Sequence, residues 1–146
     1  MTPRSLAGLA LCAALGWSLA APAGAEPQRV PLDTEATIGG VDVACTGIGQ
    51  TKDQPRWLAY PVRVEFADAK ANYLAGEVVT LSALKGAAIL EVTCEGPWLL
   101  LKLPAGHSYR VDATLTEYKT AQPRSAVVKA PNHGQARFVL TFPDAD

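Results

Sequence analysis

Two cysteines are the first residues of this sequence whose types and spacing could do chemistry. Cys45 and Cys94 lie 49 positions apart, and they are the only cysteines left if the first 25 residues are removed. Two cysteines in an exported protein usually form a disulfide, so we expect a Cys45–Cys94 bond. Closing a loop of this length stabilises a fold by about 4 kcal/mol in the chain-entropy account. The sequence lacks the C-x-x-C spacing of redox motifs, so this bond is expected to be a structural staple.

Few residues of the sequence could bind a metal ion. His107 and His133 both lie in predicted turns, and two imidazoles are too few ligands for a structural zinc site. The only methionine is Met1, which excludes a thioether copper site in the processed chain. We therefore expect no metal and no cofactor.

Catalytic groups are equally sparse. Glu65, Glu91 and Asp112 alternate with apolar residues, so they are expected on solvated strand faces and not as a carboxylate pair of the glycosidase type. No nucleophile elbow or serine-type triad is visible. The sequence favours a non-catalytic protein, with a hydrolase of unrecognised site as the weaker alternative.

Aromatic residues are the best remaining clue to binding. Trp57 and Tyr60 precede an apolar strand pattern, and Trp98 is out of phase with the leucines at 99, 101 and 103. If those leucines fill the core, Trp98 faces outward or caps an edge. An exposed tryptophan near glycine-containing loops is a candidate contact for a sugar, a peptide or another protein. The alternative is that Trp98 packs over the second face of its sheet or under the leader.

Strands must position these residues, because apolar residues recur with a period of two over most of the chain. Glycine- and proline-containing turns separate the runs, and a single helical turn fits residues 51–57. The spacing predicts an all-β protein, an antiparallel Greek-key β-sandwich of seven or eight strands. The expected strands contain Val41, Val62, Val78, Leu90, Leu99, Tyr109, Ala126 and Phe138.

The phase of the cysteines places both sulfurs in the core. Cys45 is in register with Val41 and Val43, and Cys94 with Leu90 and Val92. Side chains two positions apart share a face of a strand. The bond is therefore expected inside the sandwich, and bridging the two sheets or joining neighbouring strands both remain open.

Residues 1–25 are expected to be a cleaved signal peptide. Arg4 precedes an apolar run, and the small residues Ala23 and Ala25 fit a signal-peptidase site. We expect a flexible leader over residues 26–38, which contains Pro27 and Pro31, and the sandwich domain over residues 39–146. The processed chain has 12 basic and 14 acidic residues without a basic stripe, which argues against nucleic-acid binding. No second apolar run is long enough to span a membrane.

Three segments together resemble a known family. They are GGV through TGIG at residues 39–49, YLA at 73–75, and EGPWLLLKLPAG at 95–106 followed by YRV at 109–111. The last run resembles the core of carboxypeptidase-regulatory-like domains, which have a transthyretin-like (prealbumin-like) sandwich, and the set is similar to small exported proteobacterial proteins built on that domain. The resemblance implies the fold and not a reaction. Pro104 and Gly106 suit a tight turn, which we interpret as a hairpin.

The sequence thus predicts a periplasmic or secreted, non-catalytic binding or interaction module of the cell envelope. An envelope protein or a glycan is the expected partner, and a monomer is favoured. The alternative is a carbohydrate- or small-ligand-binding protein that uses Trp98 and Trp57.

Overall fold

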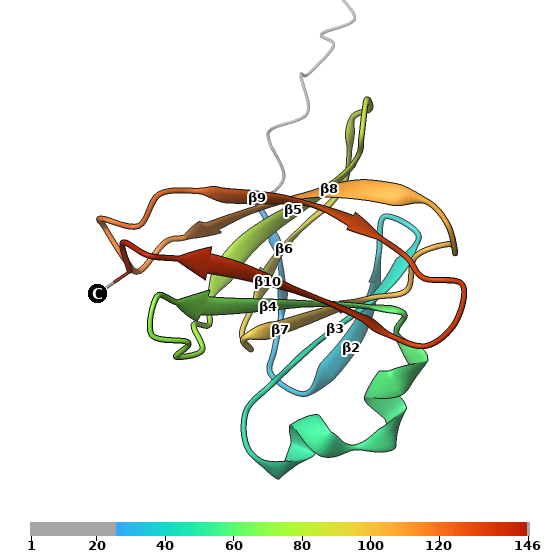
Figure 1. The fold of residues 1–146 in the computed structure, drawn as a ribbon, viewed down its shortest axis with the longest axis horizontal. Coiled ribbons are helices and arrows are strands. Elements are labelled where there is room, and N and C mark those ends of the chain that lie inside the picture. The colour runs from blue at the N-terminus through green and yellow to red at the C-terminus, as the bar shows by residue number, and fades with distance from the viewer. Residues whose placement is uncertain (1–25, 146) are drawn as a thin grey trace, which may run out of the picture.

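Alternating apolar residues form ten β-strands that pack face to face as two sheets. The computed structural model describes residues 26–145, and Figure 1 shows its two layers. One sheet has the order β1-β6-β5-β8-β9 and the other β10-β4-β7-β3-β2. Two short 3-10 helices, η1 (Gln50–Asp53) and η2 (Pro55–Ala59), lie between β3 and β4. The strands are β1 (Gln28–Val30), β2 (Thr34–Ile38), β3 (Val41–Thr46), β4 (Val62–Asp68), β5 (Glu77–Ala83), β6 (Ala88–Cys94), β7 (Trp98–Leu101), β8 (Ser108–Leu115), β9 (Arg124–Lys129) and β10 (Ala136–Phe142).

The predicted β-sandwich is confirmed, and eight of its strands lie where the alternation placed them. The prediction of seven or eight strands was too low because residues 26–38, expected as a flexible leader, form β1 and β2. Pro27 and Pro31 flank β1 without interrupting it, so neither removes a ladder hydrogen bond. The side chain of Val30 is fully buried, and β2 pairs with β3 along its whole length. The predicted signal peptide lies outside the described residues.

The predicted antiparallel arrangement is wrong for two of the strand pairs. The strand β1 runs parallel to β6, and β10 runs parallel to β4. Neither strand is joined to its partner by a hairpin turn, which would have imposed the antiparallel direction. Both parallel pairs lie at a margin of their sheet.

The core fills the space between the two sheets. Alternate residues of β3, β4 and β7 meet alternate residues of β5, β6 and β8, as the period of two predicted. Leu99 and Leu101 are fully buried there, and Leu103 continues the same face.

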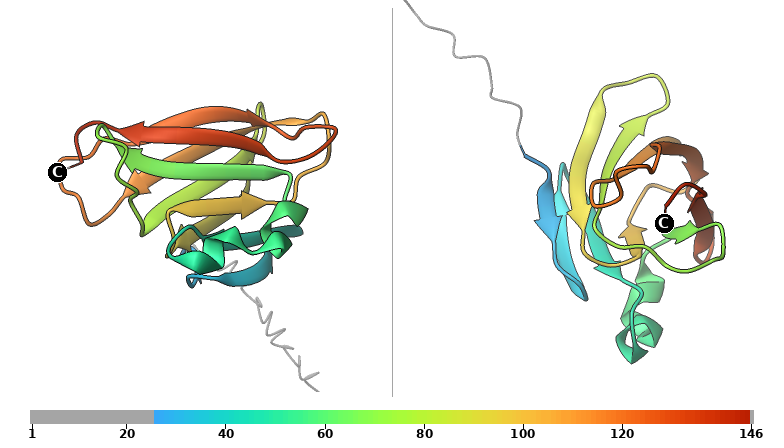
Figure 2. Two further views of the ribbon diagram at one scale, coloured as in Figure 1. Left: turned by 60° about the horizontal axis from the view of Figure 1, so that its bottom comes forward. Right: turned by 90° about the vertical axis from the view of Figure 1, so that its left-hand side faces the viewer.

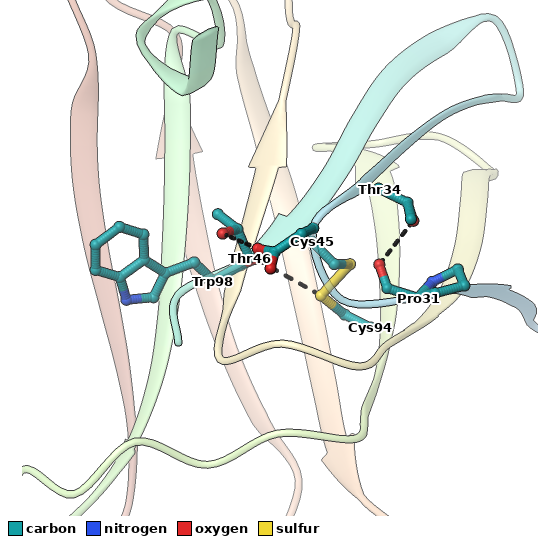
Figure 3. Close-up of a disulfide and its surroundings, with 7 residues drawn as sticks. Pro31, Thr34, Cys45, Thr46, Cys94 and Trp98 are labelled. Atoms are coloured by element: carbon teal, nitrogen blue, oxygen red, sulfur yellow. Dashed lines mark hydrogen bonds between the residues drawn. A yellow bond between two sulfur atoms is a disulfide. The ribbon is translucent and has the colours of Figure 1, made fainter. Parts of the chain in front are cut away.

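The disulfide joins Cys45 on β3 to Cys94 on β6, with a Cα–Cα distance of 5.7 Å. These strands belong to different sheets, so the bond bridges the sandwich (Figure 3). Both residues are fully buried, as their phase in the sequence predicted. Of the two arrangements left open by the sequence, the structure has the one between sheets.

The turn at Pro104 and Gly106 does not form the predicted hairpin. The strand before it, β7, pairs with β3 and β4, whereas β8 after it pairs with β5 and β9. The turn therefore carries the chain from one sheet to the other. Its local geometry is as expected, because Gly106 has a φ of +79° that a side chain would strain. The imidazoles of His107 and His133 lie in exposed loops.

Within the described residues, none of the helices has the length and apolar character needed to cross a membrane.

Replacing both cysteines by alanine should lower the free energy of unfolding by about 4 kcal/mol, because the unfolded chain gains the freedom of an open 49-residue loop. Urea unfolding of the Cys45→Ala/Cys94→Ala variant beside the parent protein measures this difference. The unfolded protein without residues 1–25, which contain Cys12, should also show no free thiol on titration. Two free thiols, or a loss below 1 kcal/mol, would contradict the structural role of the bond.

Candidate functional site

The outer face of the β10-β4-β7-β3-β2 sheet, the face turned away from the core, carries the aromatic residues that the sequence singled out. Trp98 and Leu100 point to this face because they alternate with the core residues Leu99 and Leu101. The η1–η2 segment, residues 50–59, lies over this face (Figure 2). Its Trp57 and the following Tyr60 pack against Leu100 and Ala44 in a second apolar cluster.

All three aromatic residues are buried, so the alternative that relied on exposed tryptophans is wrong. The exposed fractions are 3% for Trp57, 3% for Tyr60 and 8% for Trp98. The other possibility from the sequence, that Trp98 packs over the second face of its sheet, is the arrangement observed. Alternation predicts which face Trp98 occupies, but its cover comes from Arg63 and from Tyr73, whose ring lies edge-on at 6.0 Å.

Hydrogen bonds fix the η1–η2 segment to the sheet. Pro55 begins η2, where its missing N–H is not needed. The indole Nε1 of Trp57 donates to the carbonyl oxygen of Thr51 at 2.7 Å. Nε2 of Gln135, just before β10, donates to the carbonyl oxygens of Trp57 at 3.0 Å and Tyr60 at 2.9 Å. A residue far along the chain therefore holds the segment in place.

Trp57 and Trp98 line the same cavity of about 220 Å³ between this segment and the sheet. The structure thus brings together two of the three aromatic residues predicted as ligand contacts. The other residues lining the cavity are Lys52, Asp53, Gln54, Leu58, Arg63, Leu100 and Gln135.

Tyr60, the third predicted contact, belongs to a different hollow, which it shares with Glu35, Asp42 and Lys102. Its hydroxyl donates to Glu35 Oε1 at 2.8 Å. Burial, with help from this hydrogen bond, raises the pKa of the Tyr60 phenol. Tyr60 is therefore a packing residue beside the cavity, not one of its walls.

Glu65 is the main surprise on the outer face, since the sequence predicted a solvated carboxylate. Its exposed fraction is 0% because Tyr73, from the loop after β4, lies over it. The Tyr73 hydroxyl donates to Oε1 at 2.8 Å, and Arg137 donates to both oxygens, with Nη2 at 3.2 Å from Oε1. Nε of Arg63 lies 3.2 Å from Oε2. Burial alone would raise the pKa of Glu65, but these partners outweigh it and lower the pKa, so the group stays ionised.

Arg63 connects this ion cluster to the cavity. Its guanidinium carbon lies 4.3 Å from the centre of the Trp98 ring, in cation–π geometry. Within residues 26–145, Arg63 Nε and Trp98 Nε1 are both buried and have no hydrogen-bond partner in suitable geometry. The arrangement therefore places the Arg63 cation beside two indole rings at the cavity, whereas these two N–H groups are enclosed by the protein.

Gly47 completes the wall behind Trp98. A Cβ at this position would lie 2.8 Å from the Trp98 ring, at a φ of +114°. The bend at Gly47 is thus packed closely against the Trp98 ring.

Sequence reasoning missed Arg63, Glu65, Arg137 and Gln135. One signal was available: the alternation that puts Trp98 outward also puts Glu65, its cross-strand partner, on the same face. If Trp98 is covered, that neighbour is covered as well. Gln135 lies in a loop, where the pattern carries no such information.

A second buried acid, Glu77, lies on β5 directly opposite Cys94 of β6. It shares its strand face with the core residues Val79 and Leu81, so its side chain enters the sandwich and not the cavity. Its exposed fraction is 0%, and neither carboxyl oxygen has a side-chain or backbone partner in hydrogen-bond geometry within the described residues. Burial raises its pKa well above the ordinary value, because the neutral carboxyl is favoured away from water.

No model of a known protein family matches the chain, and comparison with curated proteins finds no match. Function is therefore inferred from the side chains described above.

Glu65→Gln should lower the free energy of unfolding by about 1–3 kcal/mol at pH 7, because a charged acceptor is lost from a buried site. The pKa of Glu65 is lowered in the folded state. Its stabilising effect is therefore present above the unfolded pKa of about 4.3 and is lost as the pH falls through the folded pKa. Urea unfolding at pH 7 and at pH 3 measures this, with the exposed Glu91→Gln as the matched control. A loss that is equal at both pH values would contradict the ionised state of Glu65.

Glu77→Gln should have the opposite pH dependence. The pKa of Glu77 is raised in the folded state, so its protonated form favours folding below about pH 4.3, and this contribution is lost as the pH rises toward the folded pKa. Because the variant stays neutral, its free energy of unfolding should exceed that of the parent protein above pH 5. The difference should grow by up to about 1.4 kcal/mol per pH unit. Unfolding curves from pH 4 to pH 8 measure the difference between the two. A difference that does not change with pH would show that Glu77 does not titrate in this way.

Proposed function

We propose that the chain is an exported, non-catalytic binding module, and that the cavity between the η1–η2 segment and β7 is its binding site for a small ligand. One observation carries this proposal: Trp57 and Trp98, which are remote in the sequence, line one cavity together with Arg63 and Gln135. Small-molecule sites typically combine apolar and aromatic walls with a few fixed polar groups.

The size and order of the cavity support this proposal. A volume of about 220 Å³ corresponds to about seven water molecules, at about 30 Å³ for each. Its polar walls are held in position: Gln135 by two backbone carbonyls, and Lys52 by Asp53 at 3.1 Å and the Gly49 carbonyl at 3.2 Å. Groups fixed before binding lose little freedom when a ligand arrives.

Export is supported by the disulfide together with the signal-peptide pattern. Disulfides such as Cys45–Cys94 persist in oxidising compartments, which favours a periplasmic or secreted protein. Membership in the carboxypeptidase-regulatory-like group is likewise a proposal, and it accords with a sandwich fold. That fold hosts many functions, so it does not choose a ligand.

The carbohydrate alternative loses its original basis, which was an exposed tryptophan. Arg56 covers the ring of Trp57 at 4.0 Å, and Arg63 covers that of Trp98 at 4.3 Å. Neither ring offers an open platform for stacking a sugar. A protein partner is the second candidate, because Leu58 at the cavity and Ile48 nearby are 68% and 51% exposed.

Tryptophan fluorescence tests the binding function directly. Trp57 and Trp98 are the only tryptophans after residue 25, so the emission of the processed protein reports on the cavity alone. We expect a saturable change in emission with at least one class in a panel of neutral sugars, amino acids, short carboxylates and their amides. Trp57→Phe and Trp98→Phe should each remove part of that signal, and free N-acetyltryptophanamide controls for quenching in solution. If no class in the panel changes the emission, the proposed ligand site is wrong.

A further inference from the structure

We propose that the ligand of this cavity is a small monocarboxylate whose charge is held by Arg63. This inference rests on the proposed binding function and names the ligand class.

One of the cations at the cavity shares its only anion with a second arginine. Of the charged residues that line it, Lys52 and Asp53 pair with each other at 3.1 Å. Arg63 remains, and its nearest carboxylate, Glu65, is already bound by Arg137 and Tyr73. The outer face thus holds two arginines around one buried glutamate. A single negative charge in the cavity would balance the second arginine, whereas a doubly charged anion would leave one negative charge in excess.

The chemistry of the Arg63 side chain points to the same ligand class. Arg63 lines the cavity, and its guanidinium has N–H donors and no acceptor. A carboxylate brings about four acceptor sites and no donor, so it complements a guanidinium. An amide or a sugar hydroxyl of the same size brings donors that a guanidinium cannot accept.

Arg63 is also oriented in advance. Its guanidinium carbon lies over the indole of Trp98, 4.3 Å from the ring centre, and its side chain is only 23% exposed. A planar guanidinium held by stacking presents its N–H groups in the fork geometry that matches a carboxylate. The apolar part of the ligand would then lie against Trp57, Leu58 and Leu100, which also line the cavity. The volume limits the ligand to about ten non-hydrogen atoms.

Thermal unfolding with matched pairs of carboxylate and amide tests the ligand class. Benzoate is compared with benzamide, and butyrate with butyramide, at constant ionic strength and with sulfate and phosphate as the other anions. The carboxylates should raise the Tm by about 5 °C at a tenfold excess over Kd. The amides should need at least tenfold higher concentrations for the same shift. Equal shifts for each pair, or a larger shift with sulfate or phosphate, would overturn the monocarboxylate.

Variants of Arg63 test the position. Arg63→Gln should weaken benzoate binding about 10- to 100-fold, and Arg63→Lys, which keeps a charge beside Glu65, should fall between this variant and the parent protein. The matched control is Arg110→Gln, because Arg110 is exposed on β8 of the other sheet and pairs with Asp112. Arg110→Gln should bind as the parent protein does. Unchanged binding by a folded Arg63→Gln variant would overturn the assignment.

The two proposals fail in different ways. If neutral sugars or amino acids change the tryptophan emission and the carboxylates do not, the binding function stands and the monocarboxylate is wrong. If no probe of any class changes either the emission or the Tm, both proposals are wrong.

Discussion

Burial of β7 on both faces is the constraint on which the rest of this structure depends. The inward residues Leu99 and Leu101 fill the core, and the outward residues Trp98 and Leu100 are buried as well. A strand that is apolar on both faces needs a layer on each side of its sheet. The opposite sheet supplies one layer, and the η1–η2 segment supplies the other. The segment between β3 and β4 is therefore a structural layer, and two hydrogen bonds from Gln135 hold it in place.

The cover of this outer face, to which Tyr73 also contributes, changes the chemistry of its polar residues. Arg63 and Glu65 lie on the outer face of β4, where an uncovered sheet would leave them in water. A buried charge must be paired and hydrogen-bonded to be tolerated. Glu65 meets this requirement fully through Tyr73 and Arg137, and it stays ionised. Arg63 meets it only in part, which leaves a positive charge at the wall of the cavity. The binding site we propose thus results from covering a sheet face on which two arginines, Arg63 and Arg137, share one glutamate, Glu65.

Local patterns predicted what depends on local geometry. The period of two located eight strands and turned both cysteines inward, because strand faces alternate whatever the fold. It did not locate β1, whose partner β6 lies far along the chain. It also missed β2, although the two-residue turn Gly39-Gly40 that joins β2 to β3 is a local hairpin signal. Pro104 and Gly106 specify a turn but not which sheet the next strand joins, so a crossing was mistaken for a hairpin. The burial of Trp98 depends on Tyr73 and Arg63, which no pattern around Trp98 records. Glu77 was the avoidable omission, because it is in phase with Val79 and Leu81.

The disulfide lies between the core and the strand that forms the cavity wall. Cys45 is the cross-strand partner of Leu99, and Cys94 Sγ lies 3.6 Å from the carbonyl oxygen of Trp98 (Figure 3). A disulfide sulfur carries no proton to donate, so this is a packing contact, and it lies at the start of β7. The bond therefore clamps the sheets together at the strand whose outward side forms the cavity wall. Because the ladder of β3 and β7 transmits the position of Cys45 to Trp98, the geometry of the site and the oxidation state of the cysteines are physically linked. In the binding module we propose, the cavity wall is therefore best fixed where the disulfide is stable.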